Sequence, residues 1–307
     1  ASIIQYSGLL FVLIIFTLLS NGRLLSPGNL KTIIRQLVII YSLSLGLVFV
    51  FTHGGFDISI GAVLALAAAA STYVMNTTNS IVLGFIAAVL ISIFFSLTNV
   101  LISIKFGLMS VISALAIMFL ARGILTYITS MSFQVISVNL DLSFFRSNII
   151  FMLIYIIFAG LIAVFLYNYT KIGKANRFIG ENIESAKHNG IQVKKYKVIA
   201  YIISGIMVGF ASIFYLARSG TVSNKAGMGL EMDVIVTLIL GGMSLNGGTR
   251  SRISSAIIGS ITFCFLNNGL ILAGVSPVMT SLFKGIIFLI IVTLIIKESS
   301  NSRVLPL

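Results

Sequence analysis

The side chains of this sequence that could do chemistry lie singly within or beside long apolar runs. Asp57 and Ser59 occur in HGGFDISIG, where one apolar run ends and the next begins. A carboxylate within a membrane span costs roughly 2.5–3.5 kcal/mol on insertion scales, so it needs a partner or a purpose. Two interpretations stay open for Asp57: with Ser59 it caps the helix that follows, or it lines a translocation path.

Four further polar residues lie inside apolar runs: Asn99, Arg122, Asn267 and Asn268. Arg122 is expected to snorkel, to pair with a carboxylate or to line a path. Amide side chains suit hydrogen bonds between helices and bonds to sugar hydroxyls equally well. His53 is expected to be a hydrogen-bonded interface residue rather than a metal ligand, because no second ligand lies near it in sequence. The predicted path residues are Asp57, Ser59, Asn99, Arg122, Asn267 and Asn268.

One stretch imitates a nucleotide-binding motif. Residues 242–249, GMSLNGGT, have the glycine spacing of a phosphate-binding P-loop, but Gly248 stands where the lysine must be and no strand pattern precedes it. The sequence has no nucleophile–base pair and no cluster of metal-ligand residues, and its single cysteine, Cys264, excludes a disulfide within the chain. The sequence therefore predicts no catalytic residues, no metal and no cofactor, and a chain that does not hydrolyse ATP by itself.

The apolar runs predict an integral membrane protein. The chain is 58% hydrophobic and only 9% charged, whereas soluble domains are about 25% charged. The runs are continuous and about 20 residues long, which is the length of a helix that crosses the bilayer. We expect an all-α polytopic membrane protein with a single transmembrane domain over residues 1–307. The first run lacks a small-residue cleavage site and is expected to be a retained helix.

About ten helices are expected, with broken or re-entrant segments near residues 53–58 and 241–250. Gly54-Gly55 and Gly241-Gly242 interrupt apolar runs in a similar way, and broken helices at membrane depth are tolerated where they face protein or a watery cavity. Residues 131–147 are polar enough to be a loop. The expected helices cover residues 8–20, 33–51, 58–74, 81–104, 108–129, 149–167, 198–217, 232–240, 253–272 and 278–296.

Charge sets the expected orientation. The net charge is +13, and residues 171–197 hold seven lysines and arginines against two glutamates. Basic loops stay in the cytoplasm, so this excess indicates membrane topology rather than nucleic-acid binding. Counting helices from this loop puts both termini in the cytoplasm. Arg23, Lys31 and Arg35 then fall outside, in mild conflict with the rule.

The basic loop also has an ordered interior. Residues 180–191, GENIESAKHNGI, are typical of a short helix closed by a glycine. Such a helix on a cytoplasmic surface suggests docking to another protein, and a solvated amphipathic loop is the alternative.

Four motifs resemble those of permease subunits of ribose-, galactose- and xylose-type sugar ABC importers. HGGFDISIG resembles the GGIDLSVG signature of that family, and residues 180–191 resemble its cytoplasmic coupling helix. LGGMSLNGGTRS (240–251) resembles a GGTSLAGG stretch, and LNNGL (266–270) a following LNNGL. Their order and spacing agree across roughly residues 25–295.

The resemblance implies a mechanism and partners. The partners are a cytoplasmic ATP-binding subunit, an extracytoplasmic solute-binding protein, a second permease subunit, a small neutral solute and membrane lipid, without nucleic acid. The implied location is the bacterial plasma (inner) membrane. The ATPase would receive a coupling segment that contains Gly180, Asn182, Ala186, Gly190 and Ile191.

Other functions remain open at this point. The solute is alternatively a nucleoside, an autoinducer furanose or a branched-chain amino acid. A secondary transporter would use Asp57 or Asp233 as a proton or sodium site. A membrane scaffold without transport is a third class.

Overall fold

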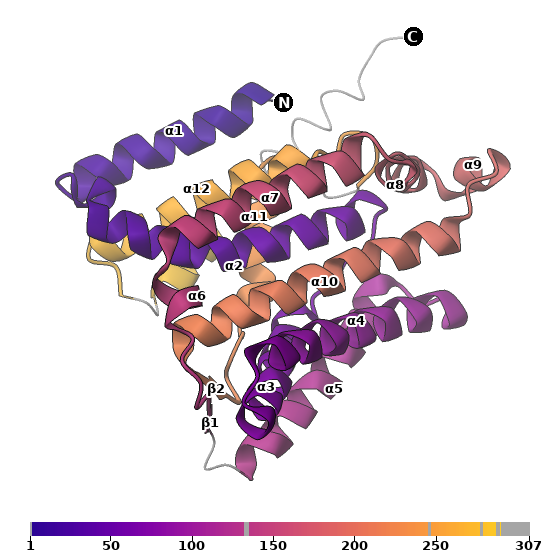
Figure 1. Cartoon of the computed structure of the whole chain (residues 1–307). Helices are drawn as coiled ribbons and strands as arrows, with labels where there is room; N and C mark the ends of the chain where they lie inside the picture. Colours follow the sequence, from indigo (N-terminus) through magenta and orange to yellow (C-terminus); the bar gives the residue numbers. More distant parts are fainter. Residues whose placement is uncertain (1, 132–134, 245–246, 277–278, 287–288, 290–307) are drawn as a thin grey trace.

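The computed structural model describes residues 2–131, 135–244, 247–276, 279–286 and 289, and these residues are almost entirely helical. Figure 1 shows long helices running in roughly one direction, with α8 and α9 at one end and a small two-stranded sheet toward the other. The elements are α1 (Ser2–Leu19), η1 (Arg23–Leu25), α2 (Pro27–Thr52), α3 (Ile60–Thr78), α4 (Ile81–Phe106), α5 (Ser110–Ser130), β1 (Val135–Ser137), α6 (Ser143–Ser147), α7 (Ile149–Asn168), α8 (Lys171–Glu181), α9 (Ile183–His188), α10 (Val193–Ser219), β2 (Thr221–Ser223), α11 (Leu230–Leu240) and α12 (Ile253–Leu272).

Nine of the ten expected helices are present among the described residues, as α1–α5, α7 and α10–α12. Seven of them are long and apolar enough to cross a bilayer: α2, α3, α4, α5, α7, α10 and α12. At 11 residues, α11 extends only about 16 Å and cannot span the membrane alone. Of the tenth range, residues 279–286 are helical and most of the rest lies outside the described residues.

The second helix begins earlier than its apolar run. Pro27 occupies the first turn, where its missing N–H is not needed. The Ser26 hydroxyl accepts a hydrogen bond from Asn29 N at 3.4 Å, which caps the helix. These signals start α2 six residues before Ile33, so it reaches 26 residues.

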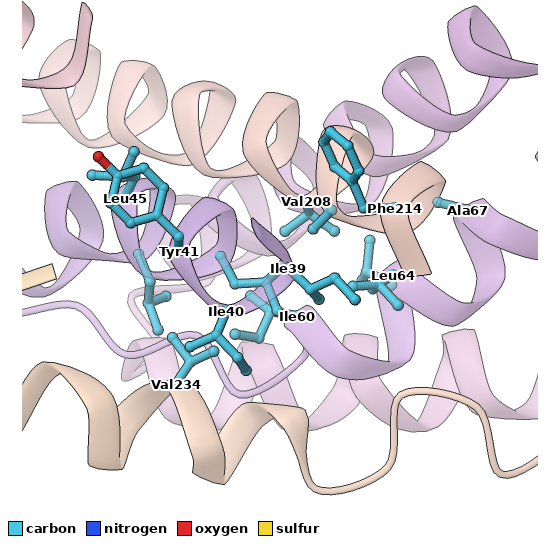
Figure 2. Close-up of a cluster of buried hydrophobic side chains, with 14 of the residues drawn as sticks. Ile39, Ile40, Tyr41, Leu45, Ile60, Leu64, Ala67, Val208, Phe214 and Val234 are labelled. Carbon is cyan, nitrogen blue, oxygen red and sulfur yellow. The ribbon is translucent and has the colours of Figure 1, made fainter. Parts of the chain in front are cut away.

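The centre of the molecule is α2, which is buried over most of its length together with α3. Figure 2 shows side chains from α2, α3, α10 and α11 meeting there, among them Ile39, Ile60 and Val208. Glycines let α10 approach its neighbours closely. A Cβ on Gly46 of α2 would lie 2.9 Å from Ser204 Cα of α10, and a Cβ on Gly209 would lie 2.7 Å from Val89 Cα of α4. Such small-residue contacts are the usual means of packing helices in a membrane.

The expectation of a plain loop over residues 131–147 is wrong. This segment contains β1 and the short helix α6, and β1 pairs antiparallel with β2, Val135 opposite Ser223. The Asn76 side chain of α3 joins the same assembly, because it donates to Ser137 O at 2.8 Å and accepts from Asn139 N at 2.9 Å. The pairing partner lies far along the chain, so the local sequence pattern could not reveal the strand.

Both expected helix breaks are present. After α2 the backbone turns at Gly54, whose φ of +79° is left-handed, and α3 begins two residues later than expected, at Ile60. After α11 the chain turns at Gly242, with φ +75°. Glycine adopts this conformation without the strain that a Cβ would add.

Candidate translocation path and coupling surface

Asp57 organises the turn that precedes α3. Its side chain is 1% exposed, and its Oδ1 accepts hydrogen bonds from Ser59 N at 2.9 Å and Ser59 Oγ at 2.6 Å. Ser59 in turn stands at the N-cap of α3, where its carbonyl accepts from Val63 N. The carboxylate therefore fixes the residue that starts α3 rather than binding a first-turn N–H itself.

Side chains from three other helices surround this carboxylate. Asn99 of α4 is its next polar neighbour, and the Asn99 Oδ1 accepts from Ser113 Oγ of α5 at 2.7 Å. Ser110 of α5 accepts from Phe56 N at 2.9 Å. Tyr201 of α10 contributes a phenol that is 1% exposed and electrostatically coupled to Asp57.

These contacts gather Asp57, Ser59 and Asn99 into one buried polar cluster, and their place in a translocation path stays a prediction. Sequence reasoning missed Ser110, Ser113 and Tyr201. The two serines lie three residues apart in an apolar run, which is the spacing of neighbours on a helix face. That spacing was the available signal.

His53 corrects one expectation. It is buried beside Asp57's turn, but neither ring nitrogen makes a hydrogen bond of ordinary geometry to a described residue. Instead the ring lies 6.0 Å, centroid to centroid, from the ring of Tyr201. Gly55 packs against the edge of this ring, where an added Cβ would come 2.5 Å from His53 Cε1.

Arg122 lies on the same helix as Ser113 but about 14 Å farther along it. Its guanidinium donates to the carbonyls of Asn224 and Ala226, in the loop between β2 and α11. The acidic side chain that attracts this guanidinium most strongly is Glu231. Arg122 therefore ties α5 to the α11 entrance, and the structure does not bring it into contact with the Asp57 cluster.

The two asparagines of α12 lie elsewhere. Asn268 Nδ2 donates to Gln36 Oε1 of α2 at 2.7 Å and to Cys264 O at 2.9 Å, so it holds α12 against α2. Gln36 lies about 24 Å along α2 from Thr52, which separates Asn268 from the Asp57 end of that helix. Asn267 is partly buried and makes no hydrogen bond to a described residue, so its place in the path stays a prediction.

Asp233 has a partner. Lys284 Nζ lies 2.9 Å from Asp233 Oδ1, and both side chains are largely buried. The same ammonium lies 5.0 Å from the ring centroid of Phe263, a favourable cation–π contact. A carboxylate neutralised in this way binds α11 to the segment 279–286 rather than standing free as an ion site.

The coupling segment is two helices rather than one. Gly180 belongs to α8, which ends at Glu181, and α9 begins at Ile183. Between them Asn182 is extended, with φ −158° and ψ 116°, and its Oδ1 caps α9 by accepting from Ser185 N at 2.9 Å. Gly190, with φ +74°, follows the end of α9 as expected.

Ala186 faces the protein. It is 3% exposed, whereas every other residue of α9 is exposed. Its carbonyl accepts from Ile191 N at 3.0 Å, which folds the chain back after the helix. Ala186 and Ile191 therefore position α9, and the surface open to a partner is formed by Ile183, Glu184, Ser185, Lys187 and His188.

The P-loop-like stretch is part of a joint that connects α8 to α2. Glu181 Oε2 accepts from Thr249 N at 3.0 Å and from Thr249 Oγ1 at 2.8 Å, while Gly248 N donates to Thr52 O at 2.8 Å. A Cβ on Gly180 would lie 2.0 Å from Thr52 O. Only glycine permits this close approach, so these glycines serve backbone packing rather than phosphate binding.

Tyr167 extends the joint to α7. Its hydroxyl donates to Ser251 O at 2.9 Å and lies 2.8 Å from Thr52 Oγ1. Arg177 of α8 donates to Tyr167 O at 3.0 Å and lies over its ring, 5.0 Å from the centroid. The ends of α2, α7 and α8 and the turn before α12 thus meet in one hydrogen-bonded unit, the inner joint (Thr52, Tyr167, Arg177, Gly180, Glu181 and residues 247–251).

The inner joint should depend on pH through Glu181. The two hydrogen bonds from Thr249 hold the pKa of this carboxyl below its ordinary value of 4.5. Because the pKa of Glu181 is lower in the folded state than in the unfolded state, the ionised carboxylate stabilises the contact at pH values above the unfolded pKa. This stabilisation is lost as the pH falls through the folded pKa. We expect hydrogen-exchange protection of the Thr249 amide, corrected for intrinsic rate, to fall as pH drops from about 6 to about 3.5.

Glu181→Gln should remove most of this pH dependence. The matched control is Glu184→Gln, because Glu184 is exposed and its one partner among the described residues is Lys187. Equal pH dependence in Glu181→Gln and the wild-type chain would show that Thr249 is protected by something other than this carboxylate.

The described residues contain no group of three or more His, Cys, Asp or Glu side chains placed to hold a metal ion.

Comparison with known proteins gives the family. Residues 29–292 match the family described as the branched-chain amino acid transport system permease component. The ribose import permease protein of Bacillus subtilis is 32% identical over 296 residues, covering 95% of this chain and 92% of the relative. The D-allose transport system permease protein of Escherichia coli is 31% identical (85% and 81% covered), and the galactofuranose transporter permease protein of the same organism 28% (88% and 80%). The chain belongs to this family of ABC-importer permeases, and it is a multi-pass membrane protein.

Proposed function

We propose that the chain is the membrane-spanning permease subunit of an ATP-binding cassette importer for a neutral sugar. The observation that carries this proposal is the set of relatives, whose names specify ribose, allose, galactofuranose and L-arabinose. The scarcity of charge along the described helices supports a neutral, hydroxyl-rich solute over an ion. A partner ATPase hydrolyses ATP, and an extracytoplasmic binding protein delivers the sugar.

The proposed orientation places α8 and α9 in the cytoplasm of a bacterium, below its plasma (inner) membrane. The basic residues of 171–197 support this side. The sheet end, with β1, β2 and α6, then faces outward, and α1 starts on the cytoplasmic side. In this orientation Arg23 and Lys31 are exposed at the outer end, as counted from the sequence, and Arg35 lies about 12 Å along α2 from Pro27, partly buried.

The proposed path follows α5, between this chain and a second permease subunit. Asp57, Ser59 and Asn99 lie by the first turns of α5, and Arg122 lies farther toward the outside. The exposed face of α5 includes the small and polar residues Ala116, Gly123, Thr126 and Ser130, beside large apolar ones such as Phe119. Small and polar residues are typical of helix contacts and of polar passages. Closure of the ATPase would move α8 and α9, and the inner joint would pass this movement to α2 and α12.

A reconstitution experiment tests the function. The chain, its ATPase and its binding protein in proteoliposomes should accumulate a labelled pentose or hexose when ATP is supplied, and leucine should not enter. An inactive ATPase should abolish uptake. Uptake that persists without ATP and follows a proton or sodium gradient would establish the ion-coupled alternative instead.

The ATPase contact can be tested at α9. Ile183 is 40% exposed on a helix otherwise rich in polar groups, and a carboxylate there would be desolvated on docking. We expect Ile183→Asp to reduce co-purification of the ATPase and ATP-driven uptake at least tenfold. The control is Val135→Asp, since Val135 is 42% exposed at the opposite end. Normal ATPase retention by Ile183→Asp would place the contact elsewhere.

A further inference from the structure

An apolar groove opens beside α10 on the outer side of the helices. Its volume is about 280 Å³, just below the roughly 300–1,000 Å³ of small-molecule pockets. Its walls come from α4, α6, α7 and α10. They are formed by Ile81, Val82, Phe85, Phe145, Phe151, Tyr155, Phe210, Ile213 and Phe214.

The walls are a continuous set of aromatic rings. Phe85 lies 4.9 Å from Phe210, and Tyr155 lies 5.6 Å from Phe210 and 4.8 Å from Phe214, centroid to centroid. The one phenol in the set turns its oxygen away, because Tyr155 OH lies 2.7 Å from Ser42 Oγ of α2. A groove without polar groups cannot recognise sugar hydroxyls, so it is not part of the solute path.

The surfaces on either side of the groove have the composition of a lipid-facing surface. Exposed residues of α4 near the groove are Val82, Leu83, Ile86 and Leu90, and those of α7 include Ile150, Leu153, Ile154, Ile157 and Phe158. These faces have none of the small residues that α5 exposes. Helix association in membranes favours small and polar residues, so hydrocarbon suits this face better than a second copy of the chain.

A cation directly follows one of the lining residues along the chain. Arg146 follows the lining residue Phe145 in α6, and its side chain is exposed. Its guanidinium makes no hydrogen bond or ion pair to a described residue. The Asp141 carboxylate accepts hydrogen bonds from Ser143 N and Ser143 Oγ at 2.8 Å each, and it attracts Arg146 through space without a direct ion pair. Arginine binds phosphate well because its planar fork matches two oxygens.

We propose that the groove binds one acyl chain of an anionic membrane lipid whose phosphate contacts Arg146. The aromatic walls supply the apolar contact and Arg146 supplies the headgroup preference. The lipid bridges α4 and α7 across α10 at the outer end of the helices.

The sequence contains no tryptophan, so a single introduced tryptophan reports its own surroundings. Phe85→Trp places the reporter in the groove, and Phe158→Trp is the control because Phe158 is 64% exposed on α7. Each variant is loaded with brominated phosphatidylglycerol and diluted into unbrominated vesicles. We expect quenching to persist at least tenfold longer for Phe85→Trp.

If the fluorescence of the two tryptophans recovered at the same rate, the groove would hold only freely exchanging bulk lipid, and this result would overturn the proposal. Absence of quenching in Phe85→Trp would show that protein, such as a second subunit, fills the groove. The headgroup is tested on an otherwise unaltered chain by native mass spectrometry. We expect Arg146→Gln to retain at least fivefold less phosphatidylglycerol than the wild-type chain, with the amount of bound phosphatidylcholine unchanged. An unchanged preference would overturn the role of Arg146.

Discussion

Replacing Gly180 with alanine should reduce ATP-driven uptake at least tenfold while the ATPase still binds. The added Cβ would lie 2.0 Å from Thr52 O and 2.5 Å from Gly248 N. Both neighbours are backbone atoms, so no flexible side chain can move aside. Overpacking of this kind typically costs about 1–3 kcal/mol, which is enough to separate α8 from the end of α2. The exposed face of α9 is untouched.

The measurement compares uptake with ATPase co-purification in the same preparation. Gly28→Ala is the matched control, because Gly28 lies in the first turn of α2 and a Cβ there meets nothing within 4 Å. Uptake within twofold of wild type in Gly180→Ala would mean that the inner joint does not transmit the movement of α8. Loss of ATPase binding as well would instead indicate that α9 itself is displaced.

Replacing Asp57 with alanine should lower the yield of folded protein at least as much as it lowers uptake per folded molecule. The change removes the acceptor of two buried hydrogen bonds, from Ser59 N and Ser59 Oγ. An unsatisfied buried donor costs about 1–3 kcal/mol. We therefore expect the melting temperature in detergent, followed by size-exclusion chromatography after heating, to fall by several degrees.

Two variants separate structure from transport at this position. Asp57→Asn keeps an oxygen for Ser59 and should recover most of the yield. Ser59→Ala removes the hydroxyl donor but leaves the bond from its backbone N–H, so its effect should be intermediate. Normal yield with selectively lost uptake in Asp57→Ala would favour direct contact between Asp57 and the solute.

Much of the fold follows from the sequence because the apolar runs are local signals. Nine expected helices and both helix breaks are present, since hydrophobic length and glycine pairs act within a few residues. The strand β1 and helix α6 were missed because β1 depends on pairing with β2, far along the chain. Ranges around α2 and α10 were too short, because their polar first turns interrupt the apolar signal.

The candidate site was predictable only in part. Asp57 and Asn99 stand out as polar residues in apolar surroundings, and the structure places them together. The joint of Glu181 with Thr249 was not predictable, because it depends on how α8 packs across the end of α2. The role of Ala186 was not predictable either. A small residue on a short helix fits contact with a partner and burial within the chain equally well, and the structure shows that Ala186 is buried.

The pairing of β1 with β2 also constrains the order in which the protein is made. Residues 135–137 leave the ribosome long before residues 221–223, yet each strand lacks its partner until both are present. Domains and segments fold from the N-terminal side during synthesis, so α1 to α5 enter the membrane before β1 can pair with β2. The hydrogen bonds of Asn76 of α3 with Ser137 and Asn139 do not involve β2. They can therefore hold β1 against α3 before β2 has been synthesised. The pairing can be completed only after α10 and β2, residues 193–223, have been synthesised.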